Sequence, residues 1–302
     1  MSDVIVITGA GGFLGSRVVP LMRRKAPRAR VLAVVRGNGR TRSLGPGVEL
    51  ISGDLRLDKV WRSLPNTVTH VIHLAAAIPW NKRHADRPAV VRDNLEPIAR
   101  LVHVSATWAA LRQVVYGSSV SVYAASRDRL RESSQAQPAT VYGAAKLSGE
   151  RLLDVLAARG GAVASLRFSS LYGAGQYQGT VLPRLAARAR RGLPLEVFNP
   201  RRVQDFLHVD DAAQATWLAY RTGAGGAFNV GTGRPVSMAM LAREVLRTFD
   251  QRGASRIVRH PHRPDDDPGL RLDVGRARRE LGYRPRVDLE HGLKQLARET
   301  AS

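Results

Sequence analysis

The stretch Thr8-Gly9-Ala10-Gly11-Gly12-Phe13-Leu14-Gly15 follows the apolar run Val4-Ile5-Val6-Ile7 and precedes a segment, residues 13–24, with apolar side chains at helical spacing. Glycine allows a sharp turn and a close approach of the backbone to a neighbouring group. The pattern predicts a strand, a tight turn and a helix whose first amide groups are free to bind a phosphate. The alternative is an ordinary glycine turn between a strand and a helix.

Further apolar runs of strand length, separated by helical patterns, extend this unit along the chain. We expect strands at 30–35, 48–51, 70–74, 113–116 and 162–166, and long helices at 88–108 and 140–157. Continuous apolar strands are typical of a parallel sheet that is buried on both faces. Pro97 is expected to kink or split the first long helix, because proline removes a backbone donor. The predicted fold class is α/β, a Rossmann-type doubly wound parallel sheet with a smaller C-terminal substrate lobe.

The alternation of strands and helices weakens after Tyr172, which indicates a second part of the chain. Here we expect helices at 182–191 and 238–249, strands at 206–209 and 227–230, and loops at 173–179, 223–226 and 260–268. We interpret residues 1–170, rejoined by 203–235, as a dinucleotide-binding domain. Residues 171–202 and 236–302 form the expected substrate-binding lobe, which would close over one edge of the sheet.

The composition excludes several classes of protein. The chain has 302 residues and no cysteine, so disulfides, thiolate metal ligands and cysteine nucleophiles are excluded, and no metal site is expected. No apolar run approaches the roughly 18 residues that span a bilayer. Nothing after Met1 resembles a secretory signal, because the first apolar run is short and leads into glycines. A cytoplasmic location without membrane contact is therefore expected.

The formal net charge of +22 raises the alternative of nucleic-acid binding, since clustered basic residues neutralise phosphates. The 47 basic residues comprise 42 Arg and 5 Lys and are scattered along the chain. The densest runs, 188–191 and 276–279, have helical context and no interleaved aromatic residues. We interpret them as solvated helix faces rather than as a nucleic-acid site. The excess charge can still attract an anionic small substrate by long-range steering.

The spacing of Gly9, Gly12 and Gly15 matches the turn that binds the pyrophosphate of a dinucleotide cofactor. Enzymes that prefer NAD place Asp or Glu about 20 residues further on, where it binds the ribose hydroxyls. Here the second strand ends in Arg36, with Arg40 and Arg42 nearby, and arginine suits the 2′-phosphate of NADP. The alternative is that Arg36 is one more surface arginine. The expected cofactor is NADP or NAD, with NADP slightly favoured.

Other residues at the ends of the predicted strands complete the expected cofactor site. Asp54 follows the third strand and can accept a hydrogen bond from the adenine amino group, or it is a plain turn aspartate. Small residues follow the fourth strand and leave room for a cofactor to lie across the strand ends. The full expected set is Gly9, Gly12, Phe13, Leu14, Gly15, Arg36, Asp54, Leu55, Ala75, Ala76, Tyr142, Lys146 and Phe168.

A tyrosine and a lysine, Tyr142 and Lys146, lie four residues apart in a predicted helix and so share one face. A phenol with a pKa near 10 is a poor base at neutral pH, and a nearby ammonium group lowers that pKa. Such a pair also occurs by chance on amphipathic helices. Ser118 and Ser119 end the preceding strand and supply a hydroxyl that can hold a substrate oxygen.

Taken together, these motifs resemble the extended short-chain dehydrogenase/reductase family, in its NAD(P)-dependent nucleotide-sugar epimerase/dehydratase branch. The resemblance covers nearly the whole chain, and it includes the segments at 8–15, 73–76, 118–123, 142–146, 166–168, 205–211, 228–231 and 281–285. It implies that Ser119, rather than Ser118, acts with Tyr142 and Lys146 as a catalytic residue. It also implies that Asn94 supports the active site and that the two long helices pack into a homodimer.

Departures from the family pattern narrow the expected chemistry. Members that remove water from sugars have acids two and three residues before the tyrosine that ends the segment 118–123, where this chain has Ser121 and Val120. Members that epimerise at C3 and C5 use a cysteine, which is absent here. Of the reactions known in the family, the one that these residues still allow is hydride transfer at a single carbinol carbon.

The substrate-binding residues implied by the resemblance are Ser119, Ser170, Arg263 and Asp266. Arg263 and Asp266 resemble a pair that grips a nucleotide diphosphate, and arginine binds phosphate with two hydrogen bonds. Two positions differ from the family, because Gln204 replaces an arginine and Ser170 replaces an asparagine. These differences weaken the case for a standard uridine-diphosphate sugar.

Two hypotheses for the activity follow from these residues. The first is a nucleotide-sugar epimerase that acts at C4 by transient hydride transfer. The second is an NADPH-dependent ketoreductase of a 4-keto sugar or another secondary-metabolite ketone, which Arg36 and Gln204 favour. A noncatalytic dinucleotide-binding regulator and a nucleic-acid binder are weaker alternatives. The expected partner is thus a nucleotide-linked sugar or another small ketone or alcohol.

Overall fold

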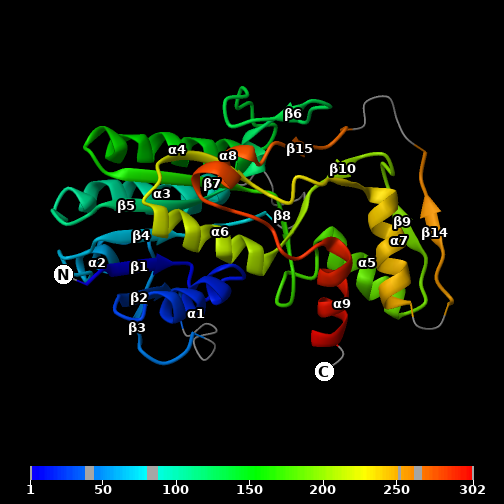
Figure 1. The fold of residues 1–302 in the computed structure, drawn as a ribbon, viewed down its shortest axis with the longest axis horizontal. Coiled ribbons are helices and arrows are strands. Elements are labelled where there is room, and N and C mark those ends of the chain that lie inside the picture. Colours follow the sequence, from blue (N-terminus) through cyan, green and yellow to red (C-terminus); the bar gives the residue numbers. More distant parts are fainter. Residues whose placement is uncertain (1, 38–43, 80–87, 251–252, 262–266, 301–302) are drawn as a thin grey trace.

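A computed structural model describes residues 2–37, 44–79, 88–250, 253–261 and 267–300 (Figure 1). Its centre is a seven-stranded sheet in which every pairing between neighbouring strands is parallel. In spatial order the strands are β12 (Gly226–Val230), β7 (Ala162–Phe168), β5 (Gln113–Ser119), β4 (His70–His73), β1 (Val4–Thr8), β2 (Arg30–Val35) and β3 (Val48–Ser52). This order confirms the predicted doubly wound α/β fold.

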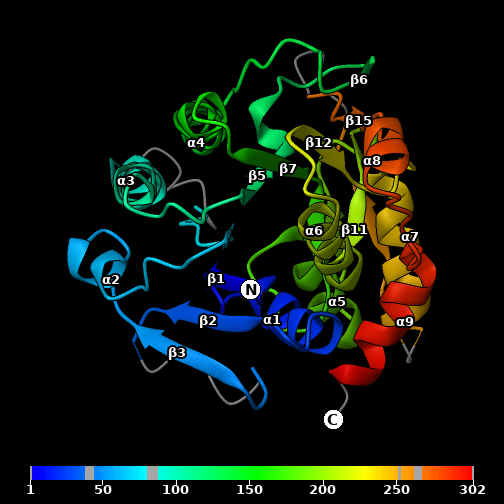
Figure 2. The same cartoon turned by 60° about the vertical axis from the view of Figure 1, so that its left-hand side comes forward.

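Helices cover both faces of the sheet, as Figure 2 shows. The helices α2 (Asp58–Arg62), α3 (Pro88–Ser105) and α4 (Val141–Ala158) lie on one face, and α1 (Gly15–Lys25) and α6 (Val209–Thr222) lie on the other. Side chains alternate along β1, so Val4 and Val6 pack in the cluster with α3 and α4. Ile5 and Ile7 point the other way and pack with α1 and α6. Burial on both faces explains why the strands read as continuous apolar runs.

The remaining elements form a second, smaller layer beside the carboxyl ends of the strands (Figure 1). Its core lies among α5 (Val181–Arg190), α7 (Met238–Phe249), α9 (Leu289–Glu299) and the paired strands β9 (Leu195–Val197) and β14 (Ile257–Arg259). Short pairs connect it to the sheet domain: β8 (Ser170–Tyr172) with β11 (Phe206–His208), β10 (Val203–Gln204) with β13 (Val236–Ser237), and β6 (Arg129–Leu130) with β15 (Arg271–Leu272). The helix α8 (Gly275–Glu280) packs on β12.

Several details differ from the sequence-based expectation. Helix α3 continues through Pro97 as one 18-residue helix, so the predicted split is wrong. Pro97 and the adjacent Ile98 are both buried against neighbouring elements, and this packing offsets the missing backbone hydrogen bond. Three helices in the described part of the chain were not predicted, α2, α6 and α9, whose amphipathic patterns begin directly after strands or turns. Tertiary burial, rather than helix propensity, stabilises such short helices.

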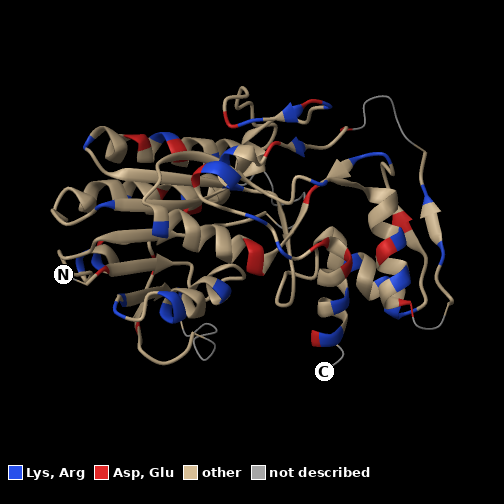
Figure 3. Ribbon diagram, in the orientation of Figure 1, with Lys and Arg blue, Asp and Glu red and all other residues tan. Residues whose placement is uncertain are grey.

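Basic residues are distributed over the helices and strands of both parts of the molecule (Figure 3). Many of them pair locally with acidic residues, for example Arg276 with Glu280 and Lys294 with Glu290. Among the described residues, no helix combines the length and the apolar character that a membrane crossing requires.

A buried ion pair joins α4 to the sheet. The Arg167 guanidinium of β7 donates two hydrogen bonds to Glu150 of α4, at 3.0 and 2.7 Å, and both side chains are less than 10% exposed. The Ser118 hydroxyl donates to the same carboxylate at 2.5 Å. Arg167 also donates to the Tyr123 hydroxyl at 2.6 Å, and that hydroxyl donates to Asn229 of β12 at 2.9 Å. One polar network therefore fixes α4, β5, β7 and β12 relative to one another.

We expect Glu150→Gln to lower the free energy of unfolding by about 3 kcal/mol, because it leaves the Arg167 charge buried without its counterion. Asp154→Asn, on the same helix, is the matched control, since Asp154 pairs with Arg151 in an exposed ion pair. That control is expected to cost less than about 1 kcal/mol. Chemical denaturation measures both values. Equal costs for the two variants would contradict the structural role given to the buried pair.

Candidate active site

Three glycines allow the turn between β1 and α1 to form. Gly9 has a φ of +66°, and a Cβ at this position would lie 2.6 Å from the backbone nitrogen of Ala75. A Cβ at Gly15 would overlap the Gly9 carbonyl oxygen and the backbone of Ala10. The Gly12 amide donates to the Gly9 carbonyl at 2.9 Å and closes the turn. A side chain is therefore excluded or strained at Gly9 and Gly15, and a Cβ at Gly12 would lie 3.0 Å from the Gly9 carbonyl oxygen.

The N-terminus of α1 faces this turn and has the chemistry of an anion site. Leu14 precedes the helix without a side-chain cap, and the first turn contains no acidic residue. The exposed Gly12 and the half-buried Phe13 leave the turn accessible. Free amide groups and the positive end of the helix dipole favour a phosphate here. The turn thus fits the pyrophosphate of the expected dinucleotide.

The strand order reverses between β1 and β4, and this is where ligands bind in open α/β sheets. Ala75 and Ala76 follow β4 at this point, as expected, and the Ala75 amide donates to the Thr8 hydroxyl at 3.3 Å. That hydroxyl also lies 2.9 Å from Nδ1 of the fully buried His73. Burial lowers the pKa of His73 to about 3, so this histidine is neutral and orders the strand ends by hydrogen bonding.

The predicted adenine and ribose contacts lie at the ends of β2 and β3. Arg36 is exposed, whereas Arg40 and Arg42 lie outside the described residues. The Arg56 guanidinium donates to both carboxylate oxygens of Asp54, which lowers the Asp54 pKa to about 2. An adenine amino group would therefore share an acceptor that Arg56 already occupies. Sequence reasoning did not identify Arg56, which follows Asp54 by only two residues.

Two further predicted cofactor residues, Leu55 and Phe168, are found at strand ends. The Leu55 carbonyl accepts a 2.7 Å hydrogen bond from the indole of Trp61, which fixes the loop after β3. Phe168 ends β7 and lies in register with Ser119, the last residue of β5. Phe168 is buried in the core beneath α1 and α6. The ends of β5 and β7 are therefore adjacent, as the expected site requires.

Ser119 lies where β5 turns toward the helix α4. Its hydroxyl accepts a hydrogen bond from the Ser121 amide and donates one to the Ser121 hydroxyl, both at 3.1 Å. The first turn of α4 packs closely on this segment, because a Cβ at Gly143 would overlap the Ser121 carbonyl oxygen. Thr140 caps the helix by accepting from the Gly143 amide at 3.0 Å. The backbone thus brings Tyr142 next to the end of β5.

Lys146 is buried between α4 and β5. Its ammonium group donates to the Gly117 carbonyl at 2.7 Å and lies 4.8 Å from the centre of the Tyr116 ring and 5.8 Å from that of Tyr142. Gly149, one turn further along, permits this close approach, since its Cβ would lie 2.5 Å from the Tyr116 hydroxyl. Tyr142 and Lys146 therefore share one helix face at the end of β5, as predicted.

The protonation equilibria of this pair differ from the expectation. Burial raises the pKa of the Tyr142 phenol well above its usual value, whereas the sequence analysis expected Lys146 to lower it. Burial lowers the pKa of Lys146 itself to about 7, and the negative charge of Glu150 opposes this shift. Desolvation outweighs the attraction between ammonium and phenolate, because Lys146 is buried and Tyr142 is half-buried.

Tyr116 is a buried residue that sequence reasoning did not place in the site. Its hydroxyl has no hydrogen-bond partner within the described part of the chain, and burial raises its pKa far above the usual value. Its ring lies under the Lys146 ammonium and also stacks near His73, with 6.0 Å between ring centres. It therefore links the lysine to the histidine at the end of β4.

Ser170, one of the residues predicted to bind the substrate, lies on β8 beside Gln204 of β10. The Ser170 hydroxyl of β8 accepts a hydrogen bond from the Gln204 amide, and Arg202 donates to the Gln204 carbonyl oxygen at 2.7 Å. Arg202 also pairs with Asp267 at 3.0 Å. The predicted residues Arg263 and Asp266 lie outside the described residues. The sequence did not identify Arg202 as a residue of the site, yet its guanidinium lies directly beside Gln204.

Asn94 ties α3 to the loop that follows β4. Its amide nitrogen donates to the Ala77 carbonyl at 2.9 Å and to the Val90 carbonyl at 2.7 Å, and its side-chain oxygen accepts from the Ala77 amide at 3.3 Å. The residue is 2% exposed. Its contacts order the segment beside Ala75 and Ala76 rather than touching Tyr142.

The site combines a glycine turn that fits pyrophosphate with a Ser/Tyr/Lys group at the same edge of the sheet. This combination defines a nicotinamide-dependent enzyme of the extended short-chain dehydrogenase/reductase type. The model of the NAD dependent epimerase/dehydratase family matches residues 5–231. The chain belongs to this family.

Relatives with assigned activities cover nearly the whole chain. The UDP-glucose 4-epimerase of Azospirillum brasilense is 29% identical, over 98% of this chain and 91% of that protein. Arabidopsis thaliana UDP-glucuronate 4-epimerase 1 is 27% identical, over 97% of this chain and 76% of its own length. Among solved structures, MoeE5 in complex with UDP-glucose and NAD is 30% identical, covers both chains fully and gives a TM-score of 0.83. The UDP-glucose 4-epimerase of Thermotoga maritima, solved with UDP-glucose, is 26% identical over 99% of this chain and 100% of that chain, with a TM-score of 0.86.

Replacing Lys146 by Met should remove a pH dependence of stability. Because the folded pKa is about 7 and the unfolded value is about 10.4, the unfolded chain binds more protons between these pH values. The stability of the wild type relative to Lys146→Met should therefore rise as pH increases from about 7 toward 10. Denaturation at a series of pH values measures this difference. Lys294→Met, in an exposed ion pair on α9, controls for loss of a lysine. A pH-independent difference for Lys146→Met would show that this lysine is not desolvated.

Proposed function

We propose that this protein is an NAD-dependent nucleotide-sugar 4-epimerase that acts by transient hydride transfer at C4. The observation that carries the proposal is the placement of Ser119, Tyr142 and Lys146 at the carboxyl edge of the sheet, beside a turn that fits pyrophosphate. The similarity to UDP-sugar 4-epimerases over almost the full chain supports it. UDP-glucose or UDP-glucuronate is the corresponding type of substrate.

The roles of the three residues follow from their chemistry. A bound nicotinamide dinucleotide supplies the acceptor and donor of the hydride at C4. Ser119 donates a hydrogen bond to the C4 oxygen and holds it toward Tyr142, whose phenolate accepts the hydroxyl proton and later returns it. Burial disfavours that phenolate, so the Lys146 ammonium is needed to stabilise it. Gly117 orients the ammonium through the 2.7 Å hydrogen bond.

The short helix after β5 favours this chemistry over dehydration. Val120 and Ser121 lie in this helix, η2 (Val120–Val122), where dehydratases of the family carry acids. The Ser121 hydroxyl and amide are both bonded to Ser119. A serine has no acidic proton to give at neutral pH, so the elimination of water lacks its proton shuttle.

NAD is the proposed cofactor. The NADP preference expected from Arg36 finds no support among the relatives, because the MoeE5 structure contains NAD. Arg36 lies exposed at the end of β2, and its charge contributes to the low pKa of Asp54. We propose that this arginine balances the charge of Asp54 rather than selecting a 2′-phosphate.

We propose that residues 171–202 and 236–302 form a substrate-binding lobe. Residues 1–170 with 203–235 form the proposed cofactor-binding domain. A separate apolar cluster within α5, α7 and α9 supports the division. Leu281 and Tyr283, however, belong to the apolar cluster beneath α1 and α6, so this part of the lobe packs against the cofactor domain. A homodimer through α3 and α4 is proposed because Val91 and Val155 are about 40% exposed on these helices.

A second candidate is an NADPH-dependent ketoreductase of a 4-keto sugar or a related ketone. The replacement of the family's arginine by Gln204 favours it. Stoichiometric loss of reduced-nicotinamide absorbance on addition of the ketone would support this activity. Turnover of a UDP-sugar without such consumption would support the epimerase instead.

Tyr142→Phe should lower kcat for interconversion of UDP-glucose and UDP-galactose, or of the corresponding uronates, by at least about 100-fold, since it removes the proton-transfer group. Nuclear magnetic resonance of the sugar C1 and C4 protons follows the reaction. Tyr220→Phe, on α6, is the matched control and should keep kcat. Retention of full activity by Tyr142→Phe would exclude the proposed mechanism.

Arg202→Gln should raise the KM for the nucleotide sugar by about tenfold with little change in kcat. The guanidinium beside Gln204 supplies the charge that the family's arginine would give, and a hydrogen bond to a charged group contributes about 1.5–3 kcal/mol. The neighbouring, exposed Arg201→Gln is the control and should leave KM unchanged. Equal effects of both variants in initial-rate measurements would argue for nonspecific attraction.

NAD should raise the melting temperature more than NADP at the same concentration, and Arg36→Gln should not reverse this order. A ligand that binds only the native state stabilises it by RT ln(1 + c/Kd) at the free ligand concentration c, so at equal concentration the tighter ligand gives the larger shift in melting temperature. A larger shift with NADP, abolished in Arg36→Gln, would show that the arginine recognises the 2′-phosphate after all.

A further inference from the structure

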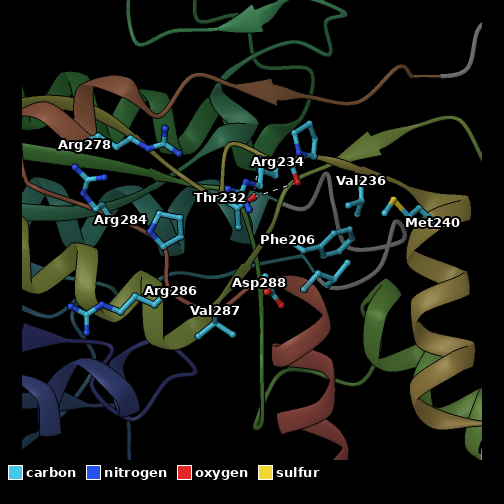
Figure 4. A pocket seen from close by; sticks show the side chains of 13 residues that line it. Phe206, Thr232, Arg234, Val236, Met240, Arg278, Arg284, Arg286, Val287 and Asp288 are labelled. Carbon is cyan, nitrogen blue, oxygen red and sulfur yellow. Dashed lines mark hydrogen bonds between the residues drawn. The ribbon is translucent and has the colours of Figure 1, made fainter.

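A cleft of about 750 Å³ lies on the side of the molecule formed by β11, the turn after β12, the start of α7 and the segment that leads into α9 (Figure 4). None of the described residues that line it comes from α3, α4 or β5. Ser119 lies on β5, and Tyr142 and Lys146 lie on α4, so the cleft does not include these residues. It adjoins the predicted substrate side, because Phe206 and Val236 lie opposite Ser170 and Gln204 in paired strands. Its volume falls within the range of small-molecule pockets, roughly 300–1,000 Å³.

Four arginines, Arg234, Arg278, Arg284 and Arg286, surround the cleft, and all four are exposed. Figure 4 shows Arg278, Arg284 and Arg286 in succession along one wall and Arg234 facing them. None of the four forms an ion pair in the described part of the chain, although the charge of Arg234 helps to lower the pKa of Asp288. Asp288 is the one acidic residue among the described lining residues. The guanidinium groups are therefore available for an anion.

Between the arginines the cleft has an apolar surface. Phe206 of β11, Val236 and Met240 contribute to it from the side of the smaller lobe, and Val287 contributes from the segment before α9. Met240 is 46% exposed, so its side chain is accessible to a ligand in the cleft. A ligand that covers this surface gains free energy from apolar burial as well as from charge.

Two buried carboxylates hold the backbone of the cleft in place. Asp205 accepts hydrogen bonds from the amides of Thr232 and Gly233, at 2.9 and 2.8 Å, and so fixes the turn that presents Arg234. Asp211 of α6 accepts from the amides of Arg286 and Val287, at 3.0 and 2.9 Å. Both aspartates are 3% exposed. The arginine side chains are not needed for these contacts, so they are free to bind.

We propose that this cleft binds an organic polyphosphate, a ligand with an apolar ring system and at least two phosphate groups. Guanidinium groups pair with phosphate oxygens through two parallel hydrogen bonds, and several of them around one cleft match a multiply charged ligand. The apolar surface between them accommodates the ring. The site is additional to the dinucleotide turn at Gly9 to Gly15 and does not depend on the proposed epimerase activity.

The test is isothermal titration with ATP, with adenosine and inorganic pyrophosphate as probes that lack one half of the recognised chemistry. The wild type should bind ATP more tightly than either probe. The double variant Arg278→Gln/Arg284→Gln should bind ATP at least tenfold more weakly. The control Arg184→Gln/Arg221→Gln removes the same charge from exposed positions of α5 and α6 and should bind ATP within twofold of the wild type.

A second variant, Met240→Glu, places a negative charge on the apolar surface and should also weaken ATP binding at least tenfold. Circular dichroism confirms that each variant is folded, and NAD affinity should stay within twofold of the wild type in all of them. Unchanged ATP affinity in the cleft variants would overturn the proposal, because ATP would then bind elsewhere. An equal loss in the control pair would also overturn it, since the attraction would come from net charge alone.

Discussion

The 2.7 Å hydrogen bond from the buried Lys146 ammonium to the Gly117 carbonyl is the contact on which the candidate site depends. It requires α4 to lie very close to the end of β5, and Gly143 and Gly149 make this possible because a side chain at either position would meet neighbouring atoms. The ion pair between Glu150 and Arg167 then fixes the helix against β7. The same packing therefore determines the position of α4 and the environment of the Lys146 charge. The helix that carries Tyr142 cannot shift without exposing or breaking buried polar groups.

The two halves of the proposed reaction site are joined by the strand ends. On one side, the turn at Gly9 to Gly15 presents free amides. On the other side, Ser119 ends β5 and Tyr142 lies beside it on α4. His73 and Tyr116 lie between them, both buried, and link Thr8 to Lys146 through a hydrogen bond and ring contacts. His73 and Lys146 are 1% and 2% exposed, so both side chains are buried. In such surroundings the interaction between an ammonium and a phenolate is much stronger than in water.

The sequence predicted those parts of the molecule that depend on local pattern. The strands from Val4 to Phe168 and the helices at Tyr142 and Met238 have periodicities of their own, and the glycine turn is specified by residues next to one another. The missed helices α2, α6 and α9 gain their stability from contacts with distant segments. The segment before α9, for example, is held on α6 by the hydrogen bonds that the Arg286 and Val287 amides donate to Asp211. Arg56 and Arg202 were missed because pairing depends on side-chain placement, which spacing does not determine. The direction of the Tyr142 pKa shift was wrong because spacing reveals a nearby charge but not the loss of solvent.

The central claim, hydride removal and return at one carbon, is tested most directly with UDP-glucose that carries deuterium at C4. The purified protein is incubated with this substrate without added nicotinamide, and mass spectrometry and nuclear magnetic resonance locate the label in the UDP-galactose formed. The account predicts that the product keeps deuterium at C4, because the same hydride equivalent is removed and returned. Product with hydrogen at C4, or turnover only with stoichiometric reduced nicotinamide, would contradict it.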